Sequence, residues 1–312
     1  MRIAIAGSSG LIGTAVAEAL TARGDTVVRL IREGSGIPPA PGRLAWDPDG
    51  AGIAPSALAG VDAVIDLCGS PIAGRRWTGA VKQELRDSRL HPTLALADAV
   101  AGEGVPVLLN ASAVGFYGNA GESVCVDAGA DATAVGDGFL ADLCAEWESA
   151  TGAASAAGAR VAHLRFGHVL SAAGGLLPIM KRVYQFALGG RLGSGHQYLP
   201  WIERSDAARA VLHVLDSQLS GAVNITGPDP ARQAAFSEAL ARRLGRPAPW
   251  VVPKSVLRLV VGEIADEGLL ASQRAVPRAL RDDGFLFAYP GLDAALAAAF
   301  DAPFGAHGAA GA

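Results

Sequence analysis

A glycine-rich turn directly follows the first strand-like run of the chain, in the stretch IAIAGSSGLIG. Gly7, Gly10 and Gly13 lie there between a continuous apolar run and a segment with the 3.6-residue spacing of a helix. Glycine at these positions allows a tight turn, close approach of the backbone to a pyrophosphate, and close packing of the helix on the strand. The N–H groups at the start of the helix would then face the phosphates. The stretch therefore predicts a strand–turn–helix unit that opens a dinucleotide-binding fold.

The first two-thirds of the chain alternates apolar runs with helical patterns. The runs lie at 2–7, 26–31, 62–69, 105–112 and 160–167, and the helical segments at 11–23, 78–102 and 138–152. Continuous apolar runs are typical of strands buried on both faces, and repeated β–α units indicate a parallel sheet covered by helices. We expect an α/β fold built on a Rossmann-type doubly wound parallel sheet.

A second unit is expected after about residue 170, where the glycine-rich stretch LGGRLGSGHQY leads into further helical segments. We expect residues 1–170 to form the nucleotide-binding Rossmann domain and 171–300 a smaller α/β unit on the substrate side. The chain is expected to cross back to the Rossmann domain around 205–226. The last residues, 301–312, offer little that could pack and predict a flexible tail.

Composition excludes several classes of function. A net charge of −4 without a basic run gives no reason to expect nucleic acid or a membrane surface. Three cysteines and six histidines lack the spacing of a disulfide framework or a metal site, so no metal is expected. No apolar run has the length of a membrane span, and a strand begins too early for a signal peptide's apolar core. We expect a cytoplasmic monomer or homodimer.

The end of the second strand indicates which dinucleotide would bind. A carboxylate there suits the ribose 2′-OH of NAD, whereas an arginine accommodates the 2′-phosphate of NADP. The strand TVVRLIRE places Arg32 at its tip, with Glu33 one residue later on the loop. We expect NADP(H) rather than NAD(H), with Arg32 against the 2′-phosphate. A solvated surface arginine is the alternative interpretation.

Many stretches in a fixed order carry a family resemblance over nearly the whole chain. They are GSSGLIG (7–13), WDP (46–48), LCGSPIAGRRWT (67–78), SRLHPT (88–93), ASAVGFYG (111–118), FLADLCAEWE (139–148), LRFGHVLSAAGGLLP (164–178), GGRLGSGHQYLPWI (189–202), VNITGPDP (223–230) and DDGFLFAYP (282–290). The ordered set resembles the extended short-chain dehydrogenase/reductase superfamily. It is most similar to an atypical branch labelled "epimerase family protein", in which a small C-terminal domain of unknown function follows the Rossmann domain.

The resemblance implies a catalytic Ser or Thr after a central strand and a Tyr-x-x-x-Lys pair on the next helix. Ser112 stands at the serine position, but Phe139 and Leu143 stand where the Tyr and Lys would lie. No lysine of the chain has a tyrosine four residues before it (Lys82, Lys181, Lys254). Phenylalanine cannot exchange a proton and leucine carries no charge. We therefore expect a packing helix here, with Glu146 and Glu148 in solvent.

The remaining candidates follow from the matched stretches. The catalytic candidates are Ser112 and Tyr117, although Tyr117 could equally be a half-buried residue with a satisfied hydroxyl. The expected cofactor-binding residues are Gly7, Ser9, Gly10, Leu11, Ile12, Gly13, Arg32, Cys68, Gly69, Ser112, Gly167 and His168. The substrate candidates are Arg75, Arg76, Trp77, Lys82, Gln197 and Trp201, and for Arg75 and Arg76 a solvated loop pair is the alternative.

Two functions remain open from the sequence. The first is an NADP(H)-dependent oxidoreductase or epimerase-like enzyme with non-standard catalytic residues that acts on a small polar or anionic substrate. The second is a non-catalytic NADP(H)-binding sensor or interaction protein. The missing Tyr-x-x-x-Lys favours the second, and the polar loops 70–82 and 189–203 favour the first.

Overall fold

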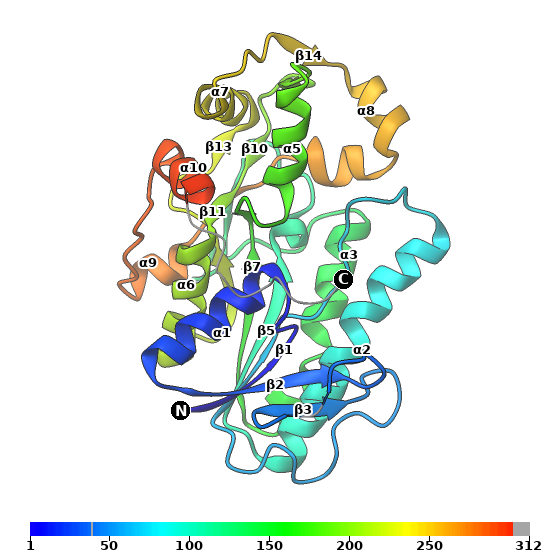
Figure 1. Ribbon diagram of the computed structural model, residues 1–312, viewed down its shortest axis with the longest axis vertical. Helices are drawn as coiled ribbons and strands as arrows, with labels where there is room; N and C mark the ends of the chain where they lie inside the picture. The colour runs from blue at the N-terminus through cyan, green and yellow to red at the C-terminus, as the bar shows by residue number, and fades with distance from the viewer. Residues whose placement is uncertain (39, 302–312) are drawn as a thin grey trace.

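A seven-stranded sheet with helices on both faces carries a small unit at one end, in the computed structural model of the chain (Figure 1). The structure describes residues 1–38 and 40–301. The elements of the Rossmann part are β1 (Arg2–Ala6), α1 (Leu11–Arg23), β2 (Thr26–Arg32), β3 (Arg43–Trp46), β4 (Ala63–Asp66), α2 (Gly79–Glu103), β5 (Val107–Ala113), η1 (Val114–Tyr117), β6 (Val124–Val126), α3 (Phe139–Ser149), α4 (Gly152–Ala156), β7 (Arg160–Phe166), α6 (Arg204–Asp216) and β12 (Gly221–Ile225). The others are β8 (His168–Leu170), α5 (Leu176–Gln185), β9 (Gly190–Leu192), β10 (Tyr198–Leu199), β11 (Trp201–Glu203), β13 (Ala231–Arg232), α7 (Gln233–Leu244), β14 (Trp250–Val252), α8 (Lys254–Val261), η2 (Ala265–Leu269), β15 (Arg274–Val276), α9 (Arg278–Asp282) and α10 (Leu292–Asp301).

The large sheet confirms the predicted doubly wound architecture. Its strand order is β12-β7-β5-β4-β1-β2-β3, and all neighbouring strands run parallel. The order reverses between β1 and β4, because the chain leaves β1 toward β2 and later returns to its other side. In open parallel sheets, ligands bind beyond the carboxyl ends of the strands at this point.

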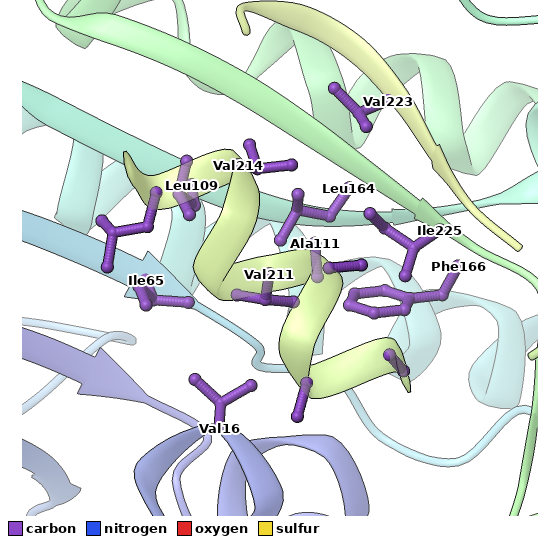
Figure 2. Packing of buried hydrophobic residues seen from close by; sticks show 14 of the residues in the cluster. Val16, Ile65, Leu109, Ala111, Leu164, Phe166, Val211, Val214, Val223 and Ile225 are labelled. Atoms are coloured by element: carbon purple, nitrogen blue, oxygen red, sulfur yellow. The ribbon is translucent and has the colours of Figure 1, made fainter. Parts of the chain in front are cut away.

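Each face of the sheet is covered by its own pair of helices. On one face α1 and α6 pack against the sheet and each other, with Val16 and Val211 fully buried among Ile65, Leu109 and Leu164 (Figure 2). On the other face α2 and α4 form a second core with the opposite side chains of the strands. The continuous apolar runs of the sequence are explained by this burial from both sides.

The chain returns to the large sheet after its first excursion into the small unit. Helix α6 packs on α1, and β12 then pairs in parallel with β7, for example Val223 with Leu164. The small unit has its own core, in which Tyr184, Trp201 and Phe236 are buried. Short strand pairs such as β9 with β14 connect its helices.

Helix α3 is a packing helix along one side, as predicted. Phe139, Leu143 and Trp147 are all buried on it. Of the predicted tail, residues 302–312 lie outside the described part of the chain. Among residues 1–38 and 40–301, no helix combines the length and apolar character needed to cross a membrane.

Candidate cofactor and substrate clefts

The glycine turn forms a cradle that no larger residue fits. Gly7 has a left-handed backbone (φ +72°), and a Cβ there would lie 2.5 Å from the carbonyl oxygen of Leu67. A Cβ on Gly13 would lie 2.1 Å from the carbonyl oxygen of Gly7. Gly10 begins α1 and offers no capping side chain, so the first N–H groups of the helix are left for a ligand. The residues present therefore fit a dinucleotide pyrophosphate.

A cleft of about 500 Å³ opens beside this cradle. It is lined by the turn itself, by the carboxyl ends of β2 and β4 and by residues that follow them, and by Trp46 and the start of α2. Of the expected cofactor residues, it brings together Gly7, Ser9, Gly10, Arg32, Cys68 and Gly69. The cleft therefore lies where the strand order reverses, as the fold requires for a nucleotide site.

Arg32 lies at the β2 end of this cleft with its charge accessible. Its Nη1 is 3.1 Å from Oδ2 of Asp49, and the two side chains are 52% and 50% exposed. Oδ1 of Asp49 also lies 2.9 Å from Nδ1 of His91. An ion pair this exposed contributes little and exchanges readily for a better anion. Arg32 is thus available to a phosphate at this end of the cleft.

Residues 67–70, which follow β4, form one wall of the cleft and are held from behind by buried polar groups. Asp66 is fully buried and accepts hydrogen bonds from Cys68 N at 2.9 Å and Thr93 Oγ1 at 2.8 Å. Burial raises the pKa of Asp66, and burial with the nearby Asp66 charge raises the pKa of the Cys68 thiol well above its usual value. Beneath Gly69 lies the guanidinium of Arg89, which donates to the carbonyl oxygen of Ser70 at 3.0 Å. These groups hold the loop in place, and the raised pKa keeps the Cys68 thiol protonated at neutral pH.

Ser112 takes part in a buried ionic network and does not line the cleft beside the glycine turn. Its Oγ donates to Oε1 of Glu148 at 2.7 Å, and Glu148 is paired with Arg165 through two hydrogen bonds of 2.7 and 2.8 Å. Burial lowers the pKa of Arg165, but the bonds to Glu148 and Tyr117 outweigh it and raise the pKa overall. The guanidinium also lies 3.4 Å from the centre of the Phe116 ring. The network joins β5, α3 and β7.

Tyr117 belongs to the same network. Its hydroxyl accepts a hydrogen bond from Nη1 of Arg165 at 3.1 Å and donates to Oδ1 of Asn224 at 2.8 Å. Burial raises the pKa of Tyr117 to about 12, although Arg165 opposes the shift. The structure thus matches the alternative interpretation of Tyr117, a buried residue with a satisfied hydroxyl.

The expectation that both glutamates of α3 lie in solvent is wrong for Glu148. The side chain of Glu148 is 10% exposed, because α3 turns it toward Ser112 and Arg165. Glu146 does lie at the surface, with its side chain 43% exposed and paired with Arg86. Two residues of spacing on a helix separate the two environments by about 200° around its axis.

Gly167 and His168 lie between the large sheet and the small unit. A Cβ on Gly167 would lie 2.8 Å from the carbonyl oxygen of Pro200, so this position also requires glycine. His168 begins β8 and pairs with Trp201 of β11. Burial lowers the pKa of His168 to about 4, so the imidazole is neutral at pH 7 although the side chain is partly accessible.

The loop between β4 and α2 bridges to the small unit instead of remaining free. Nη1 of Arg76 donates to the carbonyl oxygen of Leu259 at 3.2 Å, and Nζ of Lys82 lies 2.6 Å from Glu263. Arg75 forms an exposed ion pair with Glu84. Trp77 packs edge-on against Phe139, which stands where the family resemblance implies a catalytic tyrosine, with the ring centres 5.2 Å apart.

Gln197 and Trp201 are buried in the small unit. Nε2 of Gln197 donates to the carbonyl oxygens of Leu192 and Leu269, at 3.1 and 3.2 Å. Trp201 is 1% exposed and lies in the core of the small unit with Tyr184. Neither residue lines the cleft beside the glycine turn or the second cleft described below.

A second, polar cleft of about 320 Å³ lies beyond the end of β5, between the Rossmann part and the small unit. It is lined by Gly115, Gly118, Asn119, Asp137, Leu140, Lys254, Arg258, Asp266, Glu267, Leu270 and Ala271. Arg258 is paired with Asp266, at 2.9 Å. Lys254 packs its stem over Gly193 and has no carboxylate within 4.0 Å in the described ranges, 1–38 and 40–301. The Lys254 charge nevertheless acts on Asp266, because it contributes, after Arg258, to lowering the pKa of that carboxyl.

Glu267 connects this cleft to α3. Its carboxylate accepts hydrogen bonds from the N–H groups of Phe139 and Leu140, at 3.1 and 3.0 Å. Gly138, which precedes the helix, has φ +108° and no side chain, and a Cβ there would lie 2.6 Å from Glu267. The small unit thus supplies the cap that α3 lacks in its own sequence.

Sequence reasoning missed several of these residues for an identifiable reason. Arg165 could have been found, because a charged residue inside the apolar strand RVAHLRFG needs a buried partner. Lys254 and Glu267 carry no local signal, since their neighbours in the site come from β5, η1 and α3. In the described part of the chain, no three His, Cys, Asp or Glu gather as a metal site would require.

Comparisons with known proteins cover almost the whole chain. The family model described as "NAD dependent epimerase/dehydratase family" matches residues 3–226, and one described as a domain of unknown function, DUF1731, matches 252–299. The chain is 49% identical over 302 residues to epimerase family protein Mb2239 of Mycobacterium bovis, covering 96% of this chain and 98% of that one. It is 32% identical over 301 residues to epimerase family protein SDR39U1 of Homo sapiens, covering 95% and 98%.

Solved structures of epimerase family proteins and sugar epimerases superpose on this chain over nearly its whole length. The crystal structure of human epimerase family protein SDR39U1 (isoform 2) with NADPH superposes with a TM-score of 0.83 at 29% identity, covering 97% of this chain and all of that one. A nucleoside-diphosphate sugar epimerase from Corynebacterium glutamicum has a TM-score of 0.76 at 34% identity, covering 95% of this chain and 57% of that one. A UDP-glucose 4-epimerase from Thermus thermophilus, at 20% identity and a TM-score of 0.70, shares the fold.

Proposed function

The chain belongs to the NAD dependent epimerase/dehydratase family, and from this premise we propose that it is an NADP(H)-binding oxidoreductase or epimerase-like protein. Its substrate in this proposal is a small polar or anionic molecule. The observation that carries the proposal is the pair of clefts at the carboxyl ends of adjacent strands, β4 and β5. One has the glycine cradle and Arg32, and the other has the unpaired Lys254.

The cofactor is proposed to lie in the first cleft. Residues 7–13 would hold its pyrophosphate through backbone N–H groups, and Arg32 would hold the 2′-phosphate. The human relative was crystallised with NADPH, which supports NADP(H) over NAD(H) for this chain. When bound, the cofactor supplies or accepts a hydride. Gly167 and His168 remain proposed contacts, as do Leu11, Ile12 and Gly13.

The substrate is proposed to lie in the second cleft. A dinucleotide that runs from Arg32 across the glycine turn would extend toward the end of β5, where this cleft begins. Lys254 would bind an anionic group of the substrate, and Asn119 and Asp137 offer polar contacts. In this proposal the domain of unknown function forms the wall that recognises the substrate.

The proton that accompanies hydride transfer needs a donor or acceptor other than the usual pair. Phe139 and Leu143 cannot serve. Ser112 and Tyr117 stay the proposed catalytic residues, with Ser112 connected to the carboxylate of Glu148 at 2.7 Å. Separate replacements Ser112→Ala and Tyr117→Phe should abolish turnover while NADPH affinity changes by less than about 1 kcal/mol.

The cofactor assignment is tested by titrating NADPH and NADH against the wild type and Arg32→Ala. Wild type should prefer NADPH, and the variant should lose about 1.5–3 kcal/mol of NADPH affinity, the scale of a charge-assisted hydrogen bond, with NADH binding unchanged. Arg43→Ala is the matched control, an exposed arginine on β3 that does not line the cleft. Equal affinity of the wild type for the two cofactors would overturn the assignment.

A non-catalytic NADP(H) sensor is the second candidate. It is favoured by one observation, that the hydroxyls of Ser112 and Tyr117 are both satisfied inside the protein. Oxidation of NADPH measured across a panel of small carbonyl acids separates the candidates. Turnover that Lys254→Ala weakens through KM supports the enzyme, whereas tight NADPH binding without any turnover supports the sensor. A cytoplasmic location remains a prediction.

A further inference from the structure

Exposed apolar side chains are concentrated at one end of the small unit. The described residues include fifteen large hydrophobic side chains that are exposed, and nine of them lie in only two segments, 171–202 and 239–262. These nine are Ile179, Val183, Phe186, Leu188, Trp250, Val251, Val256, Leu259 and Val260. We call this set the apolar end. Such a concentration on one part of a protein surface indicates a binding surface rather than scattered exposure.

The members of the apolar end are connected by the fold. Ile179, Val183 and Phe186 have the spacing of one face of α5 and the residue after it. Strand β14 pairs with β9, and Nε1 of Trp250 donates to the carbonyl oxygen of Ala187 at 2.7 Å. Helix α8 follows β14 directly and carries the last three side chains. Figure 1 shows α5, β14 and α8 together at the end of the molecule away from the large sheet.

Positively charged residues are also concentrated in the two segments that carry the apolar end. Segments 171–202 and 239–262 contain eight of the chain's 26 Lys and Arg and none of its 30 Asp and Glu. Three of these cations are paired with acids from elsewhere (Arg242, Arg243 and Arg258), and a fourth, Lys254, lines the second cleft. The other four are exposed and have no carboxylate within 4.0 Å among the residues described: Lys181, Arg182, Arg191 and Arg246. The apolar end is therefore accompanied by uncompensated positive charge in a chain whose net charge is −4.

We propose that the apolar end binds the surface of an anionic lipid bilayer, which the net charge of the whole chain gave no reason to expect. Apolar side chains that include Trp and Phe, flanked by Lys and Arg, are the composition that seats a helix at the interface between headgroups and acyl chains. Phe186 is 78% exposed and Leu259 73%, so the side chains project outward and could enter a soft interface. A symmetric dimer through the same face would bring two sets of unpaired cations together, which disfavours a second copy as the occupant.

Co-sedimentation with lipid vesicles tests this contact, with phosphatidylcholine alone compared with an equal mixture of phosphatidylcholine and phosphatidylglycerol. Wild type should sediment with the mixed vesicles and much less with the neutral ones, and added salt should weaken the binding. The double variant Lys181→Gln/Arg182→Gln should bind roughly 25-fold more weakly, at about fivefold for each cation lost near an anionic surface. Phe186→Ser/Leu188→Ser should weaken binding on the order of tenfold or more.

Leu286→Ser is the matched control, because Leu286 is also 78% exposed but lies outside the two segments. It should bind vesicles like the wild type, and all variants should retain the thermal unfolding of the wild type. Absence of binding by the folded wild type, or equal binding to neutral and anionic vesicles, would overturn the proposal. So would self-association in sedimentation velocity that Phe186→Ser/Leu188→Ser abolishes, which would assign the apolar end to a second copy.

Discussion

Two polar regions lie at the same edge of the sheet and differ in what their side chains are free to do. In the first cleft, at β1, β2 and β4, the groups that would meet a ligand are backbone N–H groups and one exposed arginine, Arg32. At β5 and β7 the polar side chains bond to one another instead. The network contains Ser112, Tyr117, Glu148 and Arg165. Whether a polar residue at the end of a strand can contact a ligand therefore depends on whether its hydrogen-bonding groups are already paired inside the protein.

The difference is also one of energy. The Arg32–Asp49 pair is half in water, where an ion pair contributes little and is easily exchanged. The Arg165–Glu148 pair is buried, so the loss of either partner leaves an uncompensated charge away from water. We expect mutation of Arg32 to change mainly ligand binding, and mutation of the Arg165–Glu148 pair to change mainly stability.

Glu148→Gln gives the largest expected effect. It leaves the buried guanidinium of Arg165 without a counter-charge and should lower the free energy of unfolding by about 3–5 kcal/mol. Denaturant unfolding measures this. Glu146→Gln is the control, because Glu146 is two residues away on the same helix but pairs with Arg86 at the surface. It should cost less than about 1 kcal/mol.

Equal losses for the two glutamate variants would contradict the contrast between the regions. Activity adds a second comparison. If Glu148→Gln stopped turnover in protein that was still folded while Ser112→Ala did not, the carboxylate itself would take part in proton transfer.

His168→Gln is expected to change the stability at acid pH, by slightly less than Glu148→Gln changes it at neutral pH. Burial lowers the pKa of His168 from 6.5 to about 4 in the folded protein, so the unfolded chain binds a proton first as pH falls. The contribution of neutral His168 to the free energy of unfolding is fully present above about pH 6.5. It is lost as the pH falls toward about 4, for a total of about 3 kcal/mol. The variant should therefore lose less stability than the wild type on acidification.

Unfolding in urea at about pH 7 and about pH 5 measures the effect of His168. If the free energy of unfolding fell equally with pH in the wild type and the variant, the imidazole would not be desolvated at this position. Addition of NADPH sharpens the test, since a cofactor that contacts His168 should change the acid dependence of the wild type only.

Asp49→Asn gives the smallest expected effect. Asp49 competes with a 2′-phosphate for Arg32, so its removal should raise NADPH affinity, by less than about 1 kcal/mol because the pair is exposed. NADH titration is the control and should show no change. A fall in NADPH affinity would mean that Asp49 orients Arg32 for the phosphate instead of competing with it.

Much of the Rossmann part could be predicted, because its signals are local. The glycine turn, five buried strands and helices α1 and α2 each depend on patterns within a short stretch of chain. Strand β3 was not predicted, and for β12 only the return of the chain to the Rossmann domain around 205–226 was predicted. Strand β3 has only four residues and follows a loop rich in Gly and Pro, so it gives a weak local signal. Strand β12 is recognisable as part of the sheet only through its pairing with β7.

The sequence by itself determined the fold class, the glycine cradle, the position of Arg32 and the absence of a Tyr-x-x-x-Lys pair, since each depends on residue types at short spacing. Tertiary structure alone decided that Glu148 is buried against Ser112 and Arg165, and that Glu267 caps α3 from the small unit. It also brought the apolar end and its cations together from segments far apart, although no run of the chain is basic. Burial and charge pairing depend on which distant residues become neighbours, and folding of the whole chain sets those neighbours.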